Sequence, residues 1–134
     1  MIVVDTNVIG YLYLSAERSG QAEKALLKDP DWVSPLLWRS ELRNVLATYV
    51  SQQIIGVEDA LGIMREAESL MSGGEYDVRS ADVLRLAAQS GCSAYDCEFV
   101  ALARDLNVPL VTIDRTLIRK FKDVAVPLPR FAVA

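Results

Sequence analysis

Short apolar runs alternate along this chain with longer stretches in which apolar residues recur every three or four positions. The runs predict strands buried on both faces, and the longer stretches predict amphipathic helices. The expected strands cover residues 2–4, 32–34, 76–78 and 110–113, with an edge strand at 124–126. The expected helices are a short one over 8–14, one from Ser19 or Gly20 to about 28, one opened by Pro35, and those over about 57–71, 80–91, 93–106 and 115–121. This alternation is typical of an α/β fold with a mainly parallel sheet, and we expect residues 1–134 to form a single domain.

The apolar positions of the predicted helices indicate which helix faces are buried. In the long helix after Pro35 the apolar stripe consists of Leu42, Val45, Leu46 and Tyr49. The next two helices are expected to bury Leu61, Met64 and Leu70, and then Val83, Leu84, Leu86 and Ala87. We expect the helices over about 35–49 and 57–71 to form an arm packed against the sheet.

With 134 residues, 51% of them hydrophobic and 24% charged, the composition is that of an ordinary globular domain. Such a chain buries a core without disulfides, and we expect Cys92 and Cys97 to be small buried thiols. The apolar run over residues 8–14 is too short to cross a membrane, and no basic segment precedes it. We therefore expect no membrane association and a cytoplasmic location.

The chain contains no histidine. This excludes a histidine-based zinc site, a Ser-His-Asp triad and a histidine general base formed by the chain itself. Any catalysis must therefore use carboxylates, hydroxyl groups and a bound ion.

The net charge of −4 is unusual for a protein that binds nucleic acid. A group of carboxylates that binds a cation accounts for part of this excess. The segment 115–122 is locally basic, with no acid among Arg115, Arg119, Lys120 and Lys122. Arg39 and Arg43 also flank Glu41 in the sequence. These residues predict a basic rim that contacts phosphate groups.

Four carboxylates lie in apolar segments spread across the chain: Asp5, Glu41, Asp96 and Asp114. An ionised carboxylate in such a setting needs hydrogen bonds, a cation or a raised pKa. Asp5 and Asp114 end predicted strands, and the carboxyl ends of parallel strands line one crevice. We therefore expect these two acids to converge, with Glu41 and Asp96 reaching the same crevice from helices that follow strands.

Each acid also has an ordinary structural explanation. Asp5 and Asp114 suit helix N-caps, and Ser93 with Asp96 matches a capping box. Glu41 is placed to pair with one of the arginines beside it. For any one acid these explanations are at least as good as a functional one, and only the combination favours a shared cation.

Convergent carboxylates repel one another, since each like-charged pair costs about 3 kcal/mol at about 5 Å and an effective dielectric of about 20. A hard divalent cation, Mg²⁺ or Mn²⁺, matches oxygen ligands and the absence of histidine. Such an ion activates water for phosphodiester hydrolysis. Small polar residues near the acids can support carboxylates or waters, although a turn or cap role is commoner for each: Thr6, Asn7, Ser93 and Thr112.

The motifs VVDTNVI, SELRNVL, AYDCEFVALA and LVTIDRTL occur in this order along essentially the whole chain. In this order they resemble the PIN-domain nucleases, and the length resembles the VapC-type toxins of bacterial and archaeal toxin–antitoxin pairs. The resemblance implies a three-layer α/β/α fold and a Mg²⁺- or Mn²⁺-dependent ribonuclease. It implies that Asp5, Glu41, Asp96 and Asp114 are the catalytic, metal-binding acids. It also implies an RNA substrate, a homodimer and inhibition by a cognate antitoxin.

One position departs from the family pattern. Many relatives carry a further acid two residues after the fourth, and this chain has Thr116 there. We therefore expect one tightly held ion rather than two. Two other functions stay open. One is a non-catalytic regulatory module of the phosphoacceptor receiver type, which also gathers acids and Mg²⁺ at strand ends. The other is a degenerate nuclease fold that only binds a partner protein.

Overall fold

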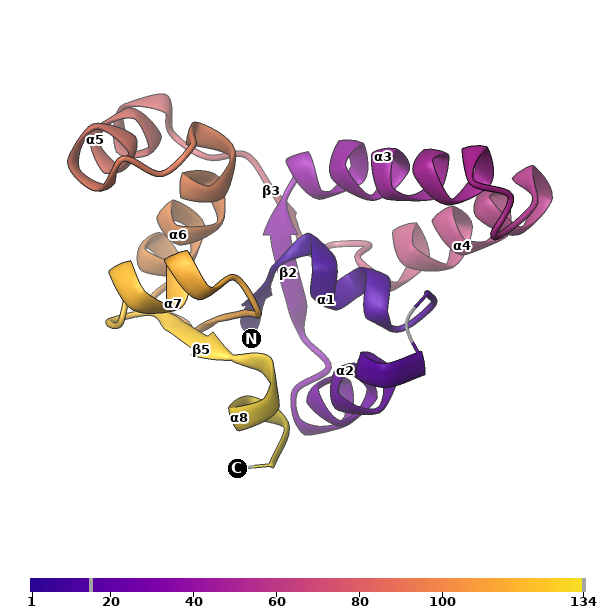
Figure 1. The fold of residues 1–134 in the computed structure, drawn as a ribbon. Helices are drawn as coiled ribbons and strands as arrows, with labels where there is room; N and C mark the ends of the chain where they lie inside the picture. Colours follow the sequence, from indigo (N-terminus) through magenta and orange to yellow (C-terminus); the bar gives the residue numbers. More distant parts are fainter. Residues whose placement is uncertain (15, 134) are drawn as a thin grey trace.

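The strands form one sheet in which every pairing is parallel (Figure 1). In the computed structural model, which describes residues 1–14 and 16–133, the strands are β1 (Ile2–Val4), β2 (Trp32–Pro35), β3 (Glu75–Tyr76), β4 (Leu110–Thr112) and β5 (Ala125–Pro127). Their order across the sheet is β3-β2-β1-β4-β5. Strands β2 and β3 therefore lie on one side of β1, and β4 and β5, which come later in the chain, lie on the other. The expected α/β class is confirmed.

Helices cover both faces of this sheet (Figure 1). They are α1 (Thr6–Tyr11), α2 (Ala16–Lys28), α3 (Leu37–Ser51), α4 (Val57–Leu70), α5 (Ser80–Ser90), α6 (Ala94–Leu106), α7 (Arg115–Lys120) and α8 (Leu128–Val133). Apolar residues of α5, α6 and α7 pack in one core, and those of α1 to α4 and α8 pack in another. The arrangement is the three-layer α/β/α fold that the resemblance to the PIN-domain nucleases implies. Among the described helices, none is long and apolar enough to cross a membrane.

The central strand β1 contributes to both cores because successive side chains of a strand point to opposite faces. Ile2 and Val4 pack in the core that contains Trp38 of α3. Val3 packs in the core that contains Phe99 of α6. This two-sided burial explains why residues 2–4 are uniformly apolar instead of alternating with polar ones.

The helices α3 and α4 pack against each other and extend away from the sheet (Figure 1). The chain leaves α4 through Gly73, whose φ of +80° favours glycine, and through Gly74, where a Cβ would overlap the Trp32 carbonyl. The expected burial of Leu61 on α4 and of Leu84 on α5 is wrong, because they are 48% and 63% exposed. The helix α4 packs mainly against α3, and α5 packs mainly against α6, so only a narrow face of α4 and of α5 is covered.

Several boundaries differ from those expected. The helix α2 begins at Ala16, before the expected Ser19 or Gly20. Pro35 does not open α3 but ends β2, because it pairs with Tyr76 in the parallel ladder. The strand β3 accordingly covers residues 75–76 and not 76–78.

Two helix ends also differ from the sequence prediction. Arg79, not Ser80, is the N-cap of α5, and its side chain makes no capping bond. The helix α8 was not expected, since the sequence analysis predicts only an edge strand, over 124–126, after α7. Pro127 does end β5, and Pro129 falls in the first turn of α8, where a missing N–H is tolerated.

Candidate active site

Asp5 directly follows β1 and is the N-cap of α1. Its Oδ1 accepts a hydrogen bond from the Thr6 N–H at 2.8 Å, and its Oδ2 accepts one from the Thr112 hydroxyl at 2.7 Å. Burial raises the pKa of Asp5 to about 6, with further increases from the charges of Glu41 and Asp96 that the two hydrogen bonds only partly offset. Asp5 does cap α1, but this role does not explain why a partly buried carboxylate lies beside two other acids.

Glu41 reaches the same region from α3. Its Oε1 accepts a hydrogen bond from the Thr6 hydroxyl at 2.7 Å. Thr6 therefore joins the two acids, since its N–H donates to Asp5 and its hydroxyl donates to Glu41. Burial raises the pKa of Glu41; the Thr6 hydrogen bond opposes this rise, and the nearby charge of Asp96 adds to it.

Asp96 lies in the first turn of α6, where its N–H donates to the Ser93 hydroxyl at 3.1 Å. Ser93 is thus the N-cap, as the sequence predicts. Within the described residues, however, the Ser93 backbone N–H makes no bond to the Asp96 carboxylate, so the return half of the capping box is not formed. Burial raises the pKa of Asp96, and the nearby charge of Asp114 raises it further. The Ser93 side chain opposes this rise. Of the four acids, Asp96 has the weakest structural explanation.

Asp114 follows β4 and caps α7, because its Oδ1 accepts hydrogen bonds from the N–H groups of Thr116 and Leu117 at 2.9 and 3.1 Å. Its own N–H donates to the Thr112 hydroxyl at 3.0 Å. The same buried hydroxyl donates to Asp5, so Thr112 connects the acids at the ends of β1 and β4. These contacts use one Asp114 oxygen and leave Oδ2 for another partner.

The Thr112 hydroxyl gives a direct test of this connection. We expect Thr112→Val, which keeps the shape of the side chain, to lower the free energy of unfolding by about 1–3 kcal/mol, because it leaves buried polar groups of Asp5 and Asp114 without a partner. Urea denaturation at pH 7 measures the change. Thr116→Val is the control, since its side chain is exposed and only its backbone N–H is bonded. Equal stabilities of the two variants would contradict the role of Thr112.

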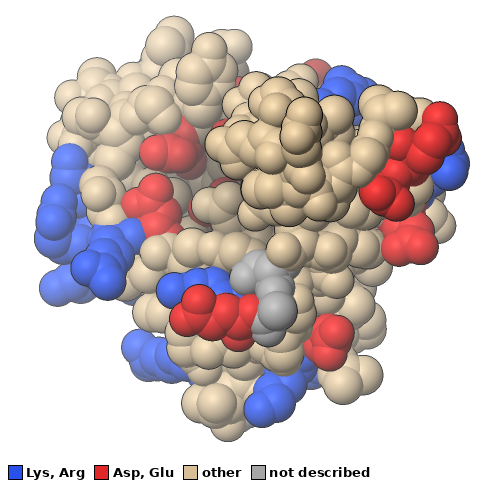
Figure 2. All heavy atoms as spheres, turned by 45° about the vertical axis from the view of Figure 1, so that its right-hand side comes forward, with Lys and Arg blue, Asp and Glu red and all other residues tan. Residues whose placement is uncertain are grey.

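The four acids, which come from four separate elements, occupy one neighbourhood. Asp5 lies within electrostatic reach of Glu41 and Asp96, and Asp96 lies within reach of Asp114. Among residues 1–14 and 16–133, no three carboxylate or thiol side chains stand close enough to hold one metal ion together. Figure 2 shows acidic side chains in a hollow of the surface with basic side chains gathered beside it. The acids therefore converge without forming a closed cage of ligands.

The chemistry of these groups fits a hard divalent cation. The donors are carboxylate oxygens, and burial and mutual repulsion raise the pKa values of Asp5, Glu41 and Asp96. In the described part of the chain no lysine or arginine pairs with any of the four acids. An open arrangement suits Mg²⁺, which keeps several water ligands and binds through one or two carboxylates. A cation bound here would relieve the repulsion among the acids.

Glu98 is a fifth acid of this neighbourhood that the sequence analysis missed. It is half-buried on α6, two residues after Asp96. Burial raises its pKa, and the nearby charges of Glu41 and Asp77 raise it further. The signal that could have identified it is a lone charged residue inside CEFVALA, an otherwise apolar segment of a helix predicted to be buried.

The predicted basic rim is only partly present. Arg39 does not contribute to it, because its guanidinium is bound by carboxylates of β3 and α4. Lys120 donates to the Ser90 carbonyl. Four further residues of the predicted rim are exposed and form no ion pair among the described residues: Arg43 on α3, and Arg115, Arg119 and Lys122 around α7. A free basic surface therefore comes from the segment around α7.

The fold and the site define a class of protein, a parallel α/β domain with carboxylates gathered beyond the carboxyl ends of its central strands. Residues 2–125 match the PIN domain family, and the chain belongs to that family.

Individual proteins agree with this assignment. The chain is 30% identical over 129 residues to Ribonuclease VapC3 of Pyrobaculum aerophilum, and the alignment covers 94% of this chain and 98% of that relative. Its fold is similar to that in the crystal structure of PAE2754 from Pyrobaculum aerophilum, with a TM-score of 0.78 at 21% identity, over 98% of this chain and 86% of the other. The resemblance to VapC-type PIN-domain proteins is confirmed. Because the chain belongs to the PIN domain family, the alternative of a receiver-type regulatory module is excluded.

Proposed function

We propose that this protein is a Mg²⁺- or Mn²⁺-dependent endoribonuclease, the toxin of a toxin–antitoxin pair, in which Asp5, Glu41, Asp96 and Asp114 form the catalytic site. The observation that carries the proposal is the gathering of these acids, from four elements, beyond the ends of β1 and β4 with no lysine or arginine of the described residues paired to them. The name of the relative, Ribonuclease VapC3, supports RNA as the substrate.

In this proposal one or two of the four carboxylates would bind the ion directly, and the others would hold its water ligands. A bound Mg²⁺ or Mn²⁺ lowers the pKa of water and stabilises negative charge on the leaving oxygen, so that no histidine is required. The hydroxyls of Thr6 and Thr112 orient Glu41 and Asp5. Thr116, an exposed neutral residue, stands where many relatives carry a further acid, which supports a single ion.

Two surface features support a single-stranded RNA substrate. The exposed basic residues around α7 suit phosphate groups. A small groove of about 80 Å³ lies between α1 and α3, and its lining includes Thr6 beside the acids as well as Tyr11 and Tyr49. Tyrosine rings are surfaces on which unpaired bases stack.

The basic surface can be tested separately from catalysis. If Arg115, Arg119 and Lys122 contact phosphates, replacing all three with glutamine should reduce the slope of log K against log salt concentration by about 2 for single-stranded RNA. Fluorescence anisotropy with labelled RNA and the Asp96→Asn variant, which we expect to be inactive, measures this slope. Lys24→Gln, at an exposed position of α2, is the control. An unchanged slope would assign the three residues to an ordinary solvated surface.

The proposed partners are a cognate antitoxin and a second copy of the chain, and the proposed location is the cytoplasm. An apolar groove between α3 and α4 supports a protein partner. Val57 and Leu61 in its lining are 59% and 48% exposed. Contiguous exposed apolar surface of this kind marks interaction sites.

The proposed reaction is tested by incubating labelled RNA with the purified protein in EDTA, Mg²⁺ or Mn²⁺. We expect internal cleavage in either metal and none in EDTA, with activity restored when excess metal is added back. Cleavage that persists in EDTA would contradict the metal mechanism. Absence of cleavage of any RNA, with metal bound, would favour a degenerate nuclease that only binds a partner.

A further inference from the structure

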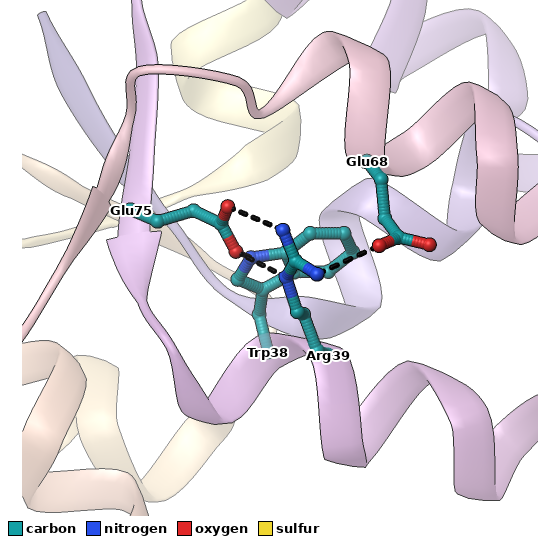
Figure 3. Close-up of polar contacts among 4 residues, drawn as sticks. All are labelled: Trp38, Arg39, Glu68 and Glu75. Carbon is teal, nitrogen blue, oxygen red and sulfur yellow. Dashed lines mark hydrogen bonds and ion pairs between the residues drawn. The ribbon is translucent and has the colours of Figure 1, made fainter.

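Arg39 joins three elements of the fold through its guanidinium group (Figure 3). Its Nε donates to Oε2 of Glu75 at 2.6 Å, and its Nη2 donates to Oε1 of the same carboxylate at 2.7 Å. Its Nη1 donates to Oε2 of Glu68 at 2.7 Å. The two parallel bonds to Glu75 fix both the distance and the orientation of the pair. Arg39 of α3 is therefore tied to β3 by Glu75 and to α4 by Glu68.

Neighbouring residues add to the connection between α3 and β3. The indole Nε1 of Trp38 donates to Oε2 of Glu75 at 2.9 Å, and the Trp38 side chain is fully buried. The Leu36 N–H donates to the Tyr76 carbonyl at 3.1 Å. Residues at the start of α3 thus bond repeatedly to residues 75–76 of β3.

The start of α3 needs this support because it has none of its own. Its N-cap, Leu36, makes no side-chain capping bond, and its first turn contains no acid. The other elements that carry the proposed site are different. Asp5, Ser93 and Asp114 each cap the helix that they precede with a side-chain hydrogen bond. Only the element that carries Glu41 depends on tertiary contacts for the direction of its first turn.

The strand β3 is a suitable anchor although it is only two residues long. Gly74, just before it, lies so close to the Trp32 carbonyl that no side chain fits there. The Gly74 carbonyl accepts a hydrogen bond from the Ser34 N–H at 2.9 Å. These contacts hold β3 against β2 without any contribution from Arg39.

Glu41 follows Arg39 by two residues, and among the residues that the structure describes its carboxylate accepts a single hydrogen bond, from Thr6. The direction of its side chain therefore depends on how the first turns of α3 are held. We propose that Arg39 and Glu75 are positioning residues, which hold the start of α3 against β3 so that Glu41 reaches the other acids. This inference rests on the proposed metal-dependent function.

The test is the affinity of the full-length protein for Mn²⁺, measured by isothermal titration calorimetry and by electron paramagnetic resonance. We expect Arg39→Gln and Glu75→Gln each to weaken Mn²⁺ binding about tenfold while circular dichroism stays unchanged. Arg39→Lys keeps the charge but not the forked geometry, and we expect a loss of about threefold. If the glutamine variants do not fold, Arg39→Lys still tests the positioning role.

Arg104→Gln is the matched control. Arg104 also bonds both oxygens of one carboxylate, that of Asp123, through Nε and Nη2 at 2.9 and 3.0 Å, but it does so on α6 away from α3. We expect its Mn²⁺ affinity to stay within about twofold of the parent. If the parent binds Mn²⁺ and the Arg39 and Glu75 variants bind it equally well, the positioning role is wrong and the network is only structural. A parent that binds no Mn²⁺ overturns the proposed function and this inference with it.

Discussion

Replacement of Asp96 by asparagine is expected to reduce RNA cleavage by about 10³-fold, which corresponds to about 4 kcal/mol of transition-state stabilisation. Asp96 is the informative choice because, among the described residues, its carboxylate forms no capping bond to a backbone N–H and lies near the charge of Asp114. The variant keeps the N–H that bonds Ser93, so α6 should still be capped. Initial rates on labelled RNA in saturating Mg²⁺, with a thermal melt of each protein, measure activity and folding separately.

Asp105→Asn is the control for this experiment. Asp105 lies on the same helix and takes the same substitution, but it is exposed and pairs with Arg79. We expect its cleavage rate to match that of the parent. If Asp96→Asn cleaved RNA as fast as Asp105→Asn, Asp96 would not belong to the catalytic site.

The second large effect is a pH-dependent loss of stability in the metal-free protein. Burial raises the pKa of Asp5 from its ordinary value of 3.8 to about 6, so the folded state favours the protonated acid. The stabilisation from Asp5 is therefore fully present below about pH 4 and is lost as the pH rises through about 6. The rise in the pKa of Asp5 corresponds to a change of at most about 3 kcal/mol in the free energy of unfolding. The raised pKa values of Glu41 and Asp96 act in the same direction.

We expect the melting temperature in EDTA to fall between pH 4 and pH 7 in the parent and to fall much less in Asp5→Asn, which resembles the protonated acid. Other acids act oppositely at lower pH, since ion pairs lower the pKa values of Glu75 and Asp123. Mg²⁺ competes with protons for the site, so its stabilising effect should grow from pH 5 to pH 7. If the melting temperatures of parent and variant fell equally between pH 4 and pH 7, Asp5 would not be the titrating group.

The convergence of Asp5 and Asp114 could be predicted from the sequence because it follows from general properties of parallel sheets. Both residues end strands, and β1 and β4 are neighbours that run in the same direction. Their capping roles could also be predicted, because capping involves residues close in sequence. Ser93 is a third case of the same kind.

The missed features depend on contacts between residues distant in sequence. The alternative explanation of Glu41, an ion pair with Arg39 or Arg43, is not formed among the described residues, because residues two apart on a helix do not face each other. Arg39 instead bonds Glu75, which is 36 residues away and is brought near by the pairing of β2 with β3. Glu98 was missed because its neighbour Glu41 belongs to another helix. The lone charge inside CEFVALA marks Glu98 locally, but no local pattern shows that Glu98 lies near Glu41 or that Arg39 bonds Glu75.

The proposed metal site can be tested directly by titrating the metal-free parent and Asp96→Asn with Mn²⁺ at pH 7, monitored by electron paramagnetic resonance. We expect the parent to bind one Mn²⁺ per chain with saturation below millimolar ion, and the variant to bind at least about tenfold more weakly. The absence of saturable binding in the parent, or equal binding by both proteins, would contradict the claim that these four carboxylates form a metal site.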